Sequence, residues 1–200
     1  NTAAIASHTN AFKINEDVVI PLDKLSEYND GIEFINIRTS IENKVQILEK
    51  IDHYLSSVNL SSSLIKAKIT SSRELVSEVK GNWLNTLKNL KDPEIFRSLQ
   101  THKTIISYKK EFIKPAHQIL IGDTFQKIRD EIEKIHAKFR EERVFIATHM
   151  HAGDGNVHTN IPVHSHNPVM LHKAEEIVKE VMDLATSLGG AISGEHGIEI

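Results

Sequence analysis

Apolar and polar side chains alternate in several short segments, and this period of two predicts strands. Residues 11–20, AFKINEDVVI, alternate in part and are followed by Pro21. The segment GIEFINIRT at 31–39 follows the turn-like YNDG at 28–31 and predicts a second strand. Residues 143–163, RVFIATHMHAGDGNVHTNIPV, predict two further strands joined by a turn.

In the middle of the chain the apolar residues recur every three or four positions, which predicts helices with one buried face. Ser40 is expected to cap the first helix. Ser71 with Glu74 forms a capping-box pattern at the start of the second. An Asp-Pro pair at 92–93 predicts the start of the third, which we expect to stop or kink near Pro115.

Two more helices are predicted towards the C-terminus. One opens at Asp123 with Gln126 three residues later, and the other opens at Asn167-Pro168. Gly189-Gly190 is expected to end the last helix, because glycine tolerates the left-handed conformation common at helix C-termini. The whole pattern predicts an α+β fold, an antiparallel sheet covered by helices, with a long helical segment at about 40–140.

The composition narrows the class of protein. Of 200 residues, 40% are hydrophobic, which is enough to bury a core in one or two domains. A formal net charge of −3 argues against nucleic acid as a partner. No apolar run is long enough to span a bilayer, no secretory signal is present, and the chain has no cysteine. We expect a cytoplasmic protein, with peripheral attachment to the inner membrane left open, and a piece of a larger polypeptide.

Residues 148–160, THMHAGDGNVHTN, hold three histidines around a predicted tight turn. Asp154-Gly155 favours a two-residue hairpin turn, whose central positions need positive φ. In that register His151 faces His158 and His149 faces Asn160, and all four side chains lie on one face. Facing Cβ atoms are roughly 4.5–5.5 Å apart, a spacing that lets two imidazoles bind one metal at about 2.0–2.1 Å per bond. The alternative is an ordinary polar hairpin that faces solvent.

A third metal ligand would favour the metal site, and the segment SGEHG at 193–197 offers one. Glu195 and His196 lie there between glycines, which allow the backbone to pass close to another group. The alternative is that these glycines only end a helix and form turns. They do not form a phosphate-binding loop, because both GxxxxGK[ST] and GxGxxG are absent.

Two segments of the chain resemble signatures of a known family. HAGDGNVHTNI at 151–161 and GGAISGEHGI at 189–198 resemble motifs of the C-terminal cap domain of FAD-linked oxidases in the vanillyl-alcohol oxidase superfamily. The opening HTNAFKINEDVVIPLDKL, with THMHAGDGNVHTNIPV, is similar to long bacterial D-lactate dehydrogenases, which fuse an FAD domain, this cap and an iron–sulfur region. The resemblance implies that residues 1–200 are a fragment of the cap, with a helical insertion at about 40–140. The FAD-binding and iron–sulfur domains then lie outside this chain.

The resemblance also implies a metal site, with the ligands His151, His158 and Glu195. His196 matches the base that takes the proton of the substrate hydroxyl. Two histidines and one carboxylate suit zinc, iron or manganese. Asn160 and Lys13 match positions that bind a small D-2-hydroxy acid.

In such an enzyme the hydroxy acid is oxidised to the 2-keto acid by proton abstraction and hydride transfer to FAD. The resemblance favours D-lactate as the substrate. FAD would be bound mainly by the FAD-binding domain of the same polypeptide. Electrons would pass to a respiratory electron acceptor, with an iron–sulfur cluster in a C-terminal region outside this chain. This fragment alone is expected to be inactive.

Other functions stay open at this point. Glycolate or D-2-hydroxyglutarate is an alternative substrate within the same family. A stand-alone metal hydrolase would use the same three ligands and an activated water, and would turn over by itself with zinc. A helical binding module with a structural metal would bind the metal without a substrate.

Overall fold

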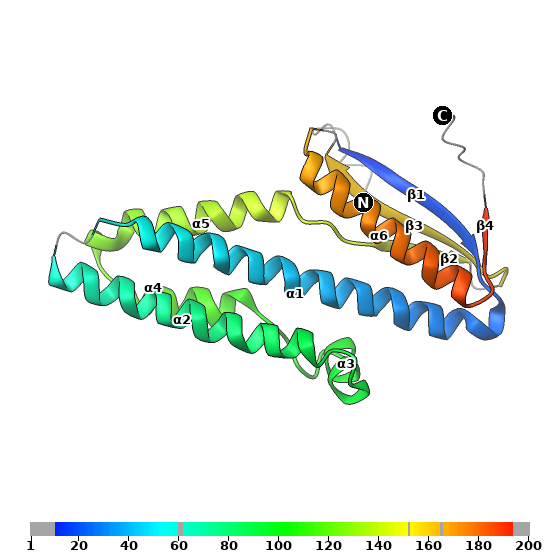
Figure 1. Ribbon diagram of the computed structural model, residues 1–200, viewed down its shortest axis with the longest axis horizontal. Coiled ribbons are helices and arrows are strands. Elements are labelled where there is room, and N and C mark those ends of the chain that lie inside the picture. The colour runs from blue at the N-terminus through cyan, green and yellow to red at the C-terminus, as the bar shows by residue number, and fades with distance from the viewer. Residues whose placement is uncertain (1–10, 60–61, 152, 165, 194–200) are drawn as a thin grey trace. The chain divides into compact units, whose positions relative to one another are not determined.

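The computed structural model describes residues 11–59, 62–151, 153–164 and 166–193. The chain divides into two compact units (Figure 1). The first contains residues 1–39 and 142–200, and the second is Ser40–Glu141. Helix α1 (Leu25–Ser57) begins in the first unit and continues into the second.

The first unit is built on a four-stranded antiparallel sheet with the strand order β2-β3-β1-β4. The strands are β1 (Ala11–Val19), β2 (Ala147–His151), β3 (Asn156–His164) and β4 (Ala191–Ser193). β1 pairs with β3 along its whole length and with β4 at its C-terminal end. The predicted α+β fold with an antiparallel sheet is therefore confirmed, as are the strand at 11–20 and the pair of strands at 143–163.

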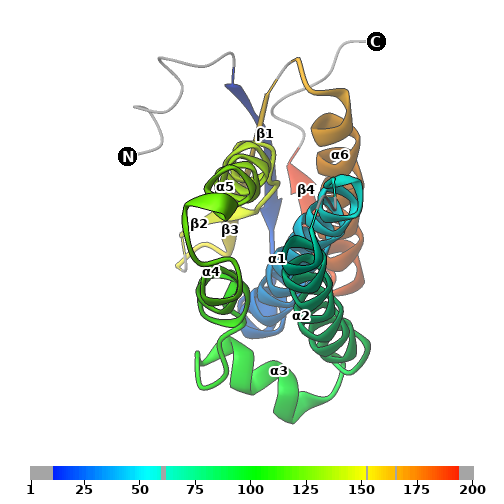
Figure 2. The same ribbon diagram turned by 90° about the vertical axis from the view of Figure 1, so that its left-hand side faces the viewer.

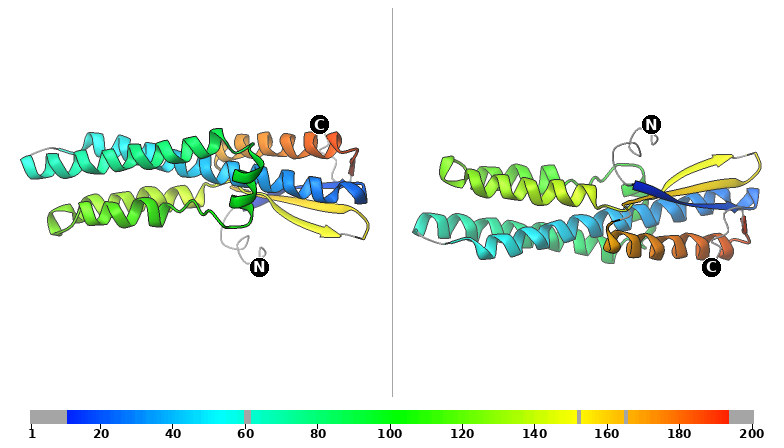
Figure 3. Two further views of the ribbon diagram at one scale, coloured as in Figure 1. Left: turned by 90° about the horizontal axis from the view of Figure 1, so that it is seen from below. Right: turned by 90° about the horizontal axis from the view of Figure 1, so that it is seen from above.

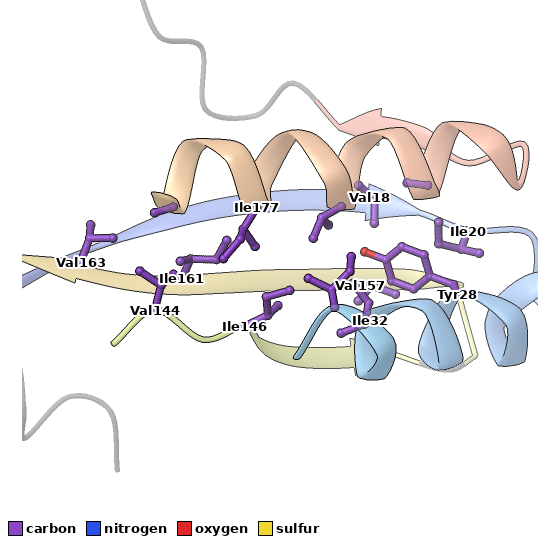
Figure 4. Close-up of a cluster of buried hydrophobic side chains, with 14 of the residues drawn as sticks. Val18, Ile20, Tyr28, Ile32, Val144, Ile146, Val157, Ile161, Val163 and Ile177 are labelled. Carbon is purple, nitrogen blue, oxygen red and sulfur yellow. The ribbon is translucent and has the colours of Figure 1, made fainter. Parts of the chain in front are cut away.

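One face of the sheet is covered by the first half of α1 and by α6 (Pro168–Ser187), which runs along the sheet (Figure 3). On β3 the buried residues are every second one, as expected for a strand with one covered face. In Figure 4 Val18 of β1 and Val157 of β3 lie between the two helices. This core includes Val18, Ile20, Tyr28, Ile32, Ile35, Val157, Ile161, Val163, Met170, Ala174, Ile177 and Val181.

The strand predicted at 31–39 and the turn predicted at 28–31 are both wrong, because α1 covers these residues. Tyr28, Ile32 and Ile35 are all buried, and their spacing places them on one helix face. Gly31 is not a turn residue: a Cβ there would lie 2.5 Å from Leu184 Cδ2 of α6. The glycine therefore allows α1 and α6 to pack closely.

The second unit is helical in the part that the structure describes. Besides the second half of α1 it contains α2 (Ser63–Lys88), α3 (Pro93–Gln100), a π-helical segment (Tyr108–Ile113), α4 (Lys114–Ile119), a 3₁₀ turn (Asp123–Phe125) and α5 (Gln126–Glu141). A second 3₁₀ turn, Leu22–Lys24, precedes α1 in the first unit. α2 lies beside α1 (Figure 2), where Arg73 Nε donates to Asp52 Oδ1 at 2.8 Å and lowers the pKa of that carboxyl. That this helical segment is an insertion in the family's cap domain stays a prediction.

Two predicted helix starts are wrong. α1 passes through Ser40 without a break, and α2 starts eight residues before Ser71, where the Ser62 hydroxyl accepts a hydrogen bond from Ile65 N at 3.2 Å. The residue after Ser71 shows why a serine is a weak guide to a helix start. Ser72 is buried within α2 and donates to the carbonyl of Lys68 at 2.9 Å, so the helix itself satisfies its hydroxyl.

The third helix begins as predicted, with Asp92 accepting from Glu94 N at 2.8 Å, but α3 already ends at Gln100 rather than near Pro115. Thr101 Oγ1 donates to the last-turn carbonyl of Arg97 at 2.7 Å, and His102 follows with φ 57°. These local bonds end the helix although the apolar pattern continues. No helix of the described residues is long and apolar enough to cross a membrane.

Candidate metal and substrate site

The hairpin of β2 and β3 carries the histidines in a register that differs from the prediction. His149 faces His158, and His151 faces Asn156, so the pairing is shifted by two residues. The two-residue turn at Asp154-Gly155 is wrong, because four residues, 152–155, separate the strands. Side chains repeat every two residues along a strand, so a shift of two keeps each side chain on its predicted face.

Gly155 fixes the end of this hairpin against β1. Its φ is +70°, and its carbonyl accepts a hydrogen bond from Ile20 N at 2.8 Å. A Cβ at this position would overlap the carbonyl oxygen of Ile20, well inside the 3.0 Å that real Cβ atoms keep. Asp154 N donates to the carbonyl of His151 at 3.0 Å and closes the turn. Gly155 therefore meets both a conformational and a packing requirement.

The three histidine rings meet on the sheet face opposite to the helices. The centroid of the His151 ring lies 5.0 Å from that of His149 and 5.5 Å from that of His158, edge-on in both cases. The centroids of His149 and His158 are 6.3 Å apart. Two imidazoles on one tetrahedral metal place their centroids roughly 5 Å apart. The hairpin thus gathers imidazoles at a spacing suited to a shared ligand.

Asp17 is a member of this group that the sequence analysis missed. It pairs with His158 in the sheet, and its Oδ1 lies 2.7 Å from His158 Nδ1. The carboxylate is largely covered, with 14% of the side chain exposed, while the His158 side chain is 34% exposed. The alternation along AFKINEDVVI places Lys13, Asn15 and Asp17 at equivalent positions, but only the pairing of β1 with β3 shows which residues they meet.

The register also relates the other predicted residues to the histidines. Ser193 of β4 pairs with Asp17, so one row across the sheet contains His149, His158, Asp17 and Ser193. Asn160 lies one row further along β3, roughly 7 Å away, and pairs with Asn15. Lys13 pairs with Pro162 in the row after that. The sheet therefore brings together the backbone positions of Lys13, Asn160 and the histidines.

Glu195 and His196 lie outside the described residues. Among the residues that the structure does describe, no group of three or more histidine, aspartate or glutamate side chains is arranged to hold a metal ion. The ligand set of His151, His158 and Glu195, and the role of His196 as a base, therefore stay predictions. The same holds for substrate binding by Asn160 and Lys13.

A comparison with protein families decides the class of this chain. Residues 72–198, more than half of its length, match the family described as FAD linked oxidases, C-terminal domain. The chain belongs to this family. The resemblance found from HAGDGNVHTNI and GGAISGEHGI is thereby confirmed, and the α+β fold agrees with it.

Short segments of the chain also match individual oxidoreductases. Glycolate oxidase subunit GlcD of Escherichia coli (strain K12) is 43% identical over 53 residues, 26% of this chain and 11% of that protein. D-lactate dehydrogenase of Archaeoglobus fulgidus is 44% identical over 62 residues, 29% and 12% of the two chains. An uncharacterized FAD-linked oxidoreductase of Mycobacterium tuberculosis is 46% identical over 48 residues, 24% and 9%.

The chain spans about a tenth of the length of the curated relatives it matches. No solved structure matches the chain. The domain match over residues 72–198 thus establishes the family of this chain.

Proposed function

We propose that this chain is the metal- and substrate-binding part of the cap domain of an FAD-dependent D-2-hydroxy-acid dehydrogenase. The proposed substrate is D-lactate, which would be oxidised to its 2-keto acid. Membership of the FAD-linked oxidase family supports the reaction class. The observation that carries the proposal is the meeting of the His151 and His158 rings, 5.5 Å apart, on the sheet face opposite to α1 and α6.

In this proposal His151 and His158 supply two of the ligands of a divalent metal. Asp17 engages Nδ1 of His158, which leaves Nε2 for a metal, the arrangement in which a carboxylate orients a ligating histidine. Near these rings, the side-chain oxygen of Asn156, the register partner of His151, is buried and has no hydrogen-bond partner among the described residues. A buried oxygen without a partner is expected next to a position that a further ligand would occupy.

The remaining metal ligand in the proposal is Glu195. It follows Ser193, the β4 residue in the row of His158, by only two residues. Two residues of extended chain span at most about 7 Å, a length that allows Glu195 to approach this row. When bound, a divalent metal would make the substrate hydroxyl more acidic and the flavin would accept the hydride.

The chain's own residues would bind the substrate and move its proton. Asn160 supplies an amide donor one row from His158, and Lys13 supplies a cation for the substrate carboxylate. His196, next to the proposed ligand Glu195, would accept the hydroxyl proton. In this proposal FAD is bound mainly by a separate domain of the same polypeptide. The iron–sulfur cluster lies in a region outside this chain, and a respiratory electron acceptor receives the electrons.

Glycolate is the second candidate substrate. It is favoured by the match to a glycolate oxidase subunit, which is 43% identical over 53 residues. D-lactate and glycolate differ by one methyl group at the reacting carbon. Anaerobic reduction of the flavin in the full-length protein by each acid, together with D-2-hydroxyglutarate, ranks the three substrates. Fastest reduction by D-lactate is the expected result.

The proton-abstraction role is tested with His196→Ala in the full-length protein. We expect flavin reduction by D-lactate to be lost while the flavin stays bound, because no base takes the hydroxyl proton. His172→Ala is the matched control, since that side chain is 75% exposed on α6. Reduction at the wild-type rate in the His196 variant would rule out the proposed base.

The metal site is tested by measuring bound metal in purified wild-type protein and in His158→Ala. We expect about one divalent ion per chain in the wild type and in His172→Ala, and none in His158→Ala, because two remaining ligands hold a metal poorly. Equal metal content in wild type and His158→Ala would contradict the proposed ligand set.

A further inference from the structure

The Asp17 carboxylate and the His158 ring are held against each other by two paired strands. Asp17 comes from β1 and His158 from β3, and the two residues face each other in the antiparallel register. The neighbouring pair, Val18 and Val157, is completely buried. A slip of one residue would turn these valines out of the core, so the register that joins Asp17 to His158 is strongly fixed.

The 2.7 Å contact determines where the proton of the ring lies. An ionised carboxylate has only acceptors, so the hydrogen bond requires a proton on His158 Nδ1. In a neutral imidazole the other nitrogen, Nε2, then carries the lone pair. A ring held in the opposite tautomer would place N–H at Nε2 and could not bind a cation there.

The ring is also fixed in direction. The His158 side chain is about one-third exposed, on the same face as the rings of His149 and His151, while the carboxylate beside it is largely covered. Because Nδ1 contacts the largely covered Asp17 carboxylate, the opposite edge of the ring, which bears Nε2, is left for a ligand on the sheet face that carries His149 and His151. This is the orientation that a metal ligand needs.

We propose that Asp17 is a positioning residue: it holds His158 in the Nδ1–H tautomer and in one orientation, so that Nε2 alone is offered to a cation. The part that concerns the cation rests on the proposed function, in which His158 is a metal ligand. The part that concerns the tautomer stands on the geometry alone.

The tautomer is measured directly by ¹⁵N NMR of histidine side chains in the full, metal-free chain in mildly alkaline buffer. His158 is assigned by the signal that disappears in His158→Gln. The expected wild-type pattern is Nδ1–H. In Asp17→Val, which has no acceptor, the Nε2–H form should become populated. Asp17→Asn retains an oxygen that accepts from Nδ1–H and should restore the wild-type pattern at least in part.

Zinc titration of the same proteins tests the consequence for the cation. The affinity of Asp17→Val for zinc should be about 10- to 100-fold weaker than that of the wild type. Asp154→Asn removes a charge from the exposed turn near the histidines and should bind zinc like the wild type, which separates ring positioning from general electrostatics. Far-UV circular dichroism confirms that each variant is folded, and Asp17→Asn provides the comparison if Asp17→Val is not.

The two proposals fail in different ways. An Nε2–H pattern in the wild type, or the same tautomer in wild type and both Asp17 variants, would overturn the positioning role. A changed tautomer with unchanged zinc affinity would overturn its connection to the cation. A changed tautomer without zinc binding by any of the proteins would support the positioning of His158 and contradict the metal function instead.

Discussion

Gly155→Ala is the most informative single change in the sheet that carries the histidines. An alanine at φ +70° costs about 1–2 kcal/mol relative to a right-handed conformation. Its Cβ would also overlap the Ile20 carbonyl oxygen, so the chain must move and weaken the hydrogen bond from Ile20 N to Gly155, a loss of about 1 kcal/mol. Ile20 is 1% exposed, and shifting its packing costs a further 1–3 kcal/mol or so.

Together these terms predict a destabilisation of about 3–6 kcal/mol for the sheet, a large share of the roughly 5–15 kcal/mol that stabilises a typical domain. Trp83, the chain's only tryptophan, belongs to the second unit, so its fluorescence does not report on the sheet directly. Amide hydrogen exchange in β1 and β3 does, and we expect it to be accelerated by at least about 100-fold, since 1.4 kcal/mol corresponds to tenfold.

Gly153→Ala is the matched control within the same turn. A Cβ at Gly153 would have no atom within 4 Å, and its φ is not positive. Its effect should stay within about 0.5 kcal/mol, as is usual for exposed positions. Equal exchange rates in the two alanine variants would contradict this prediction, because the clash and the left-handed conformation at position 155 would then not destabilise the sheet.

Two further changes test the packing of each unit. Asn36→Ala should accelerate exchange of the Ile146 amide and destabilise the start of β2 by about 1–3 kcal/mol, because the Asn36 side chain donates to Ile146 O at 3.1 Å and accepts from Ile146 N at 3.0 Å. Wild-type protection of Ile146 in that variant would contradict the role of these two bonds. Gly81→Ala should stabilise α2 by about 1 kcal/mol, because the position is exposed within the helix and a Cβ would meet no atom within 4 Å. Urea unfolding followed by Trp83 fluorescence measures this change, and a lower midpoint than the wild type would show that Gly81 has a packing role.

Some features of the fold could be predicted because they depend on residues close together in the sequence. Asp92 and Asn167 cap the helices that follow them, through hydrogen bonds that reach only two or three residues along the chain. Gly189, at φ +77°, follows the end of α6 as expected. The alternation in THMHAGDGNVHTN likewise predicted that its histidines lie on one face. That prediction is correct although the predicted register was wrong by two residues.

The other features depend on parts of the chain that are far apart. The sequence shows a glycine at position 31, but not that Leu184 of α6 lies against it, so a turn was predicted within a helix. Asp17 and His158 are 141 positions apart, and no local pattern relates a carboxylate in one strand to an imidazole in another. Local spacing thus determined helix ends and strand faces, because the interactions that fix them act within a few residues. The strand order, the register and the partner of His158 were decided only by tertiary packing, where burial of Val18 against Val157 selects one pairing among several that local preferences allow.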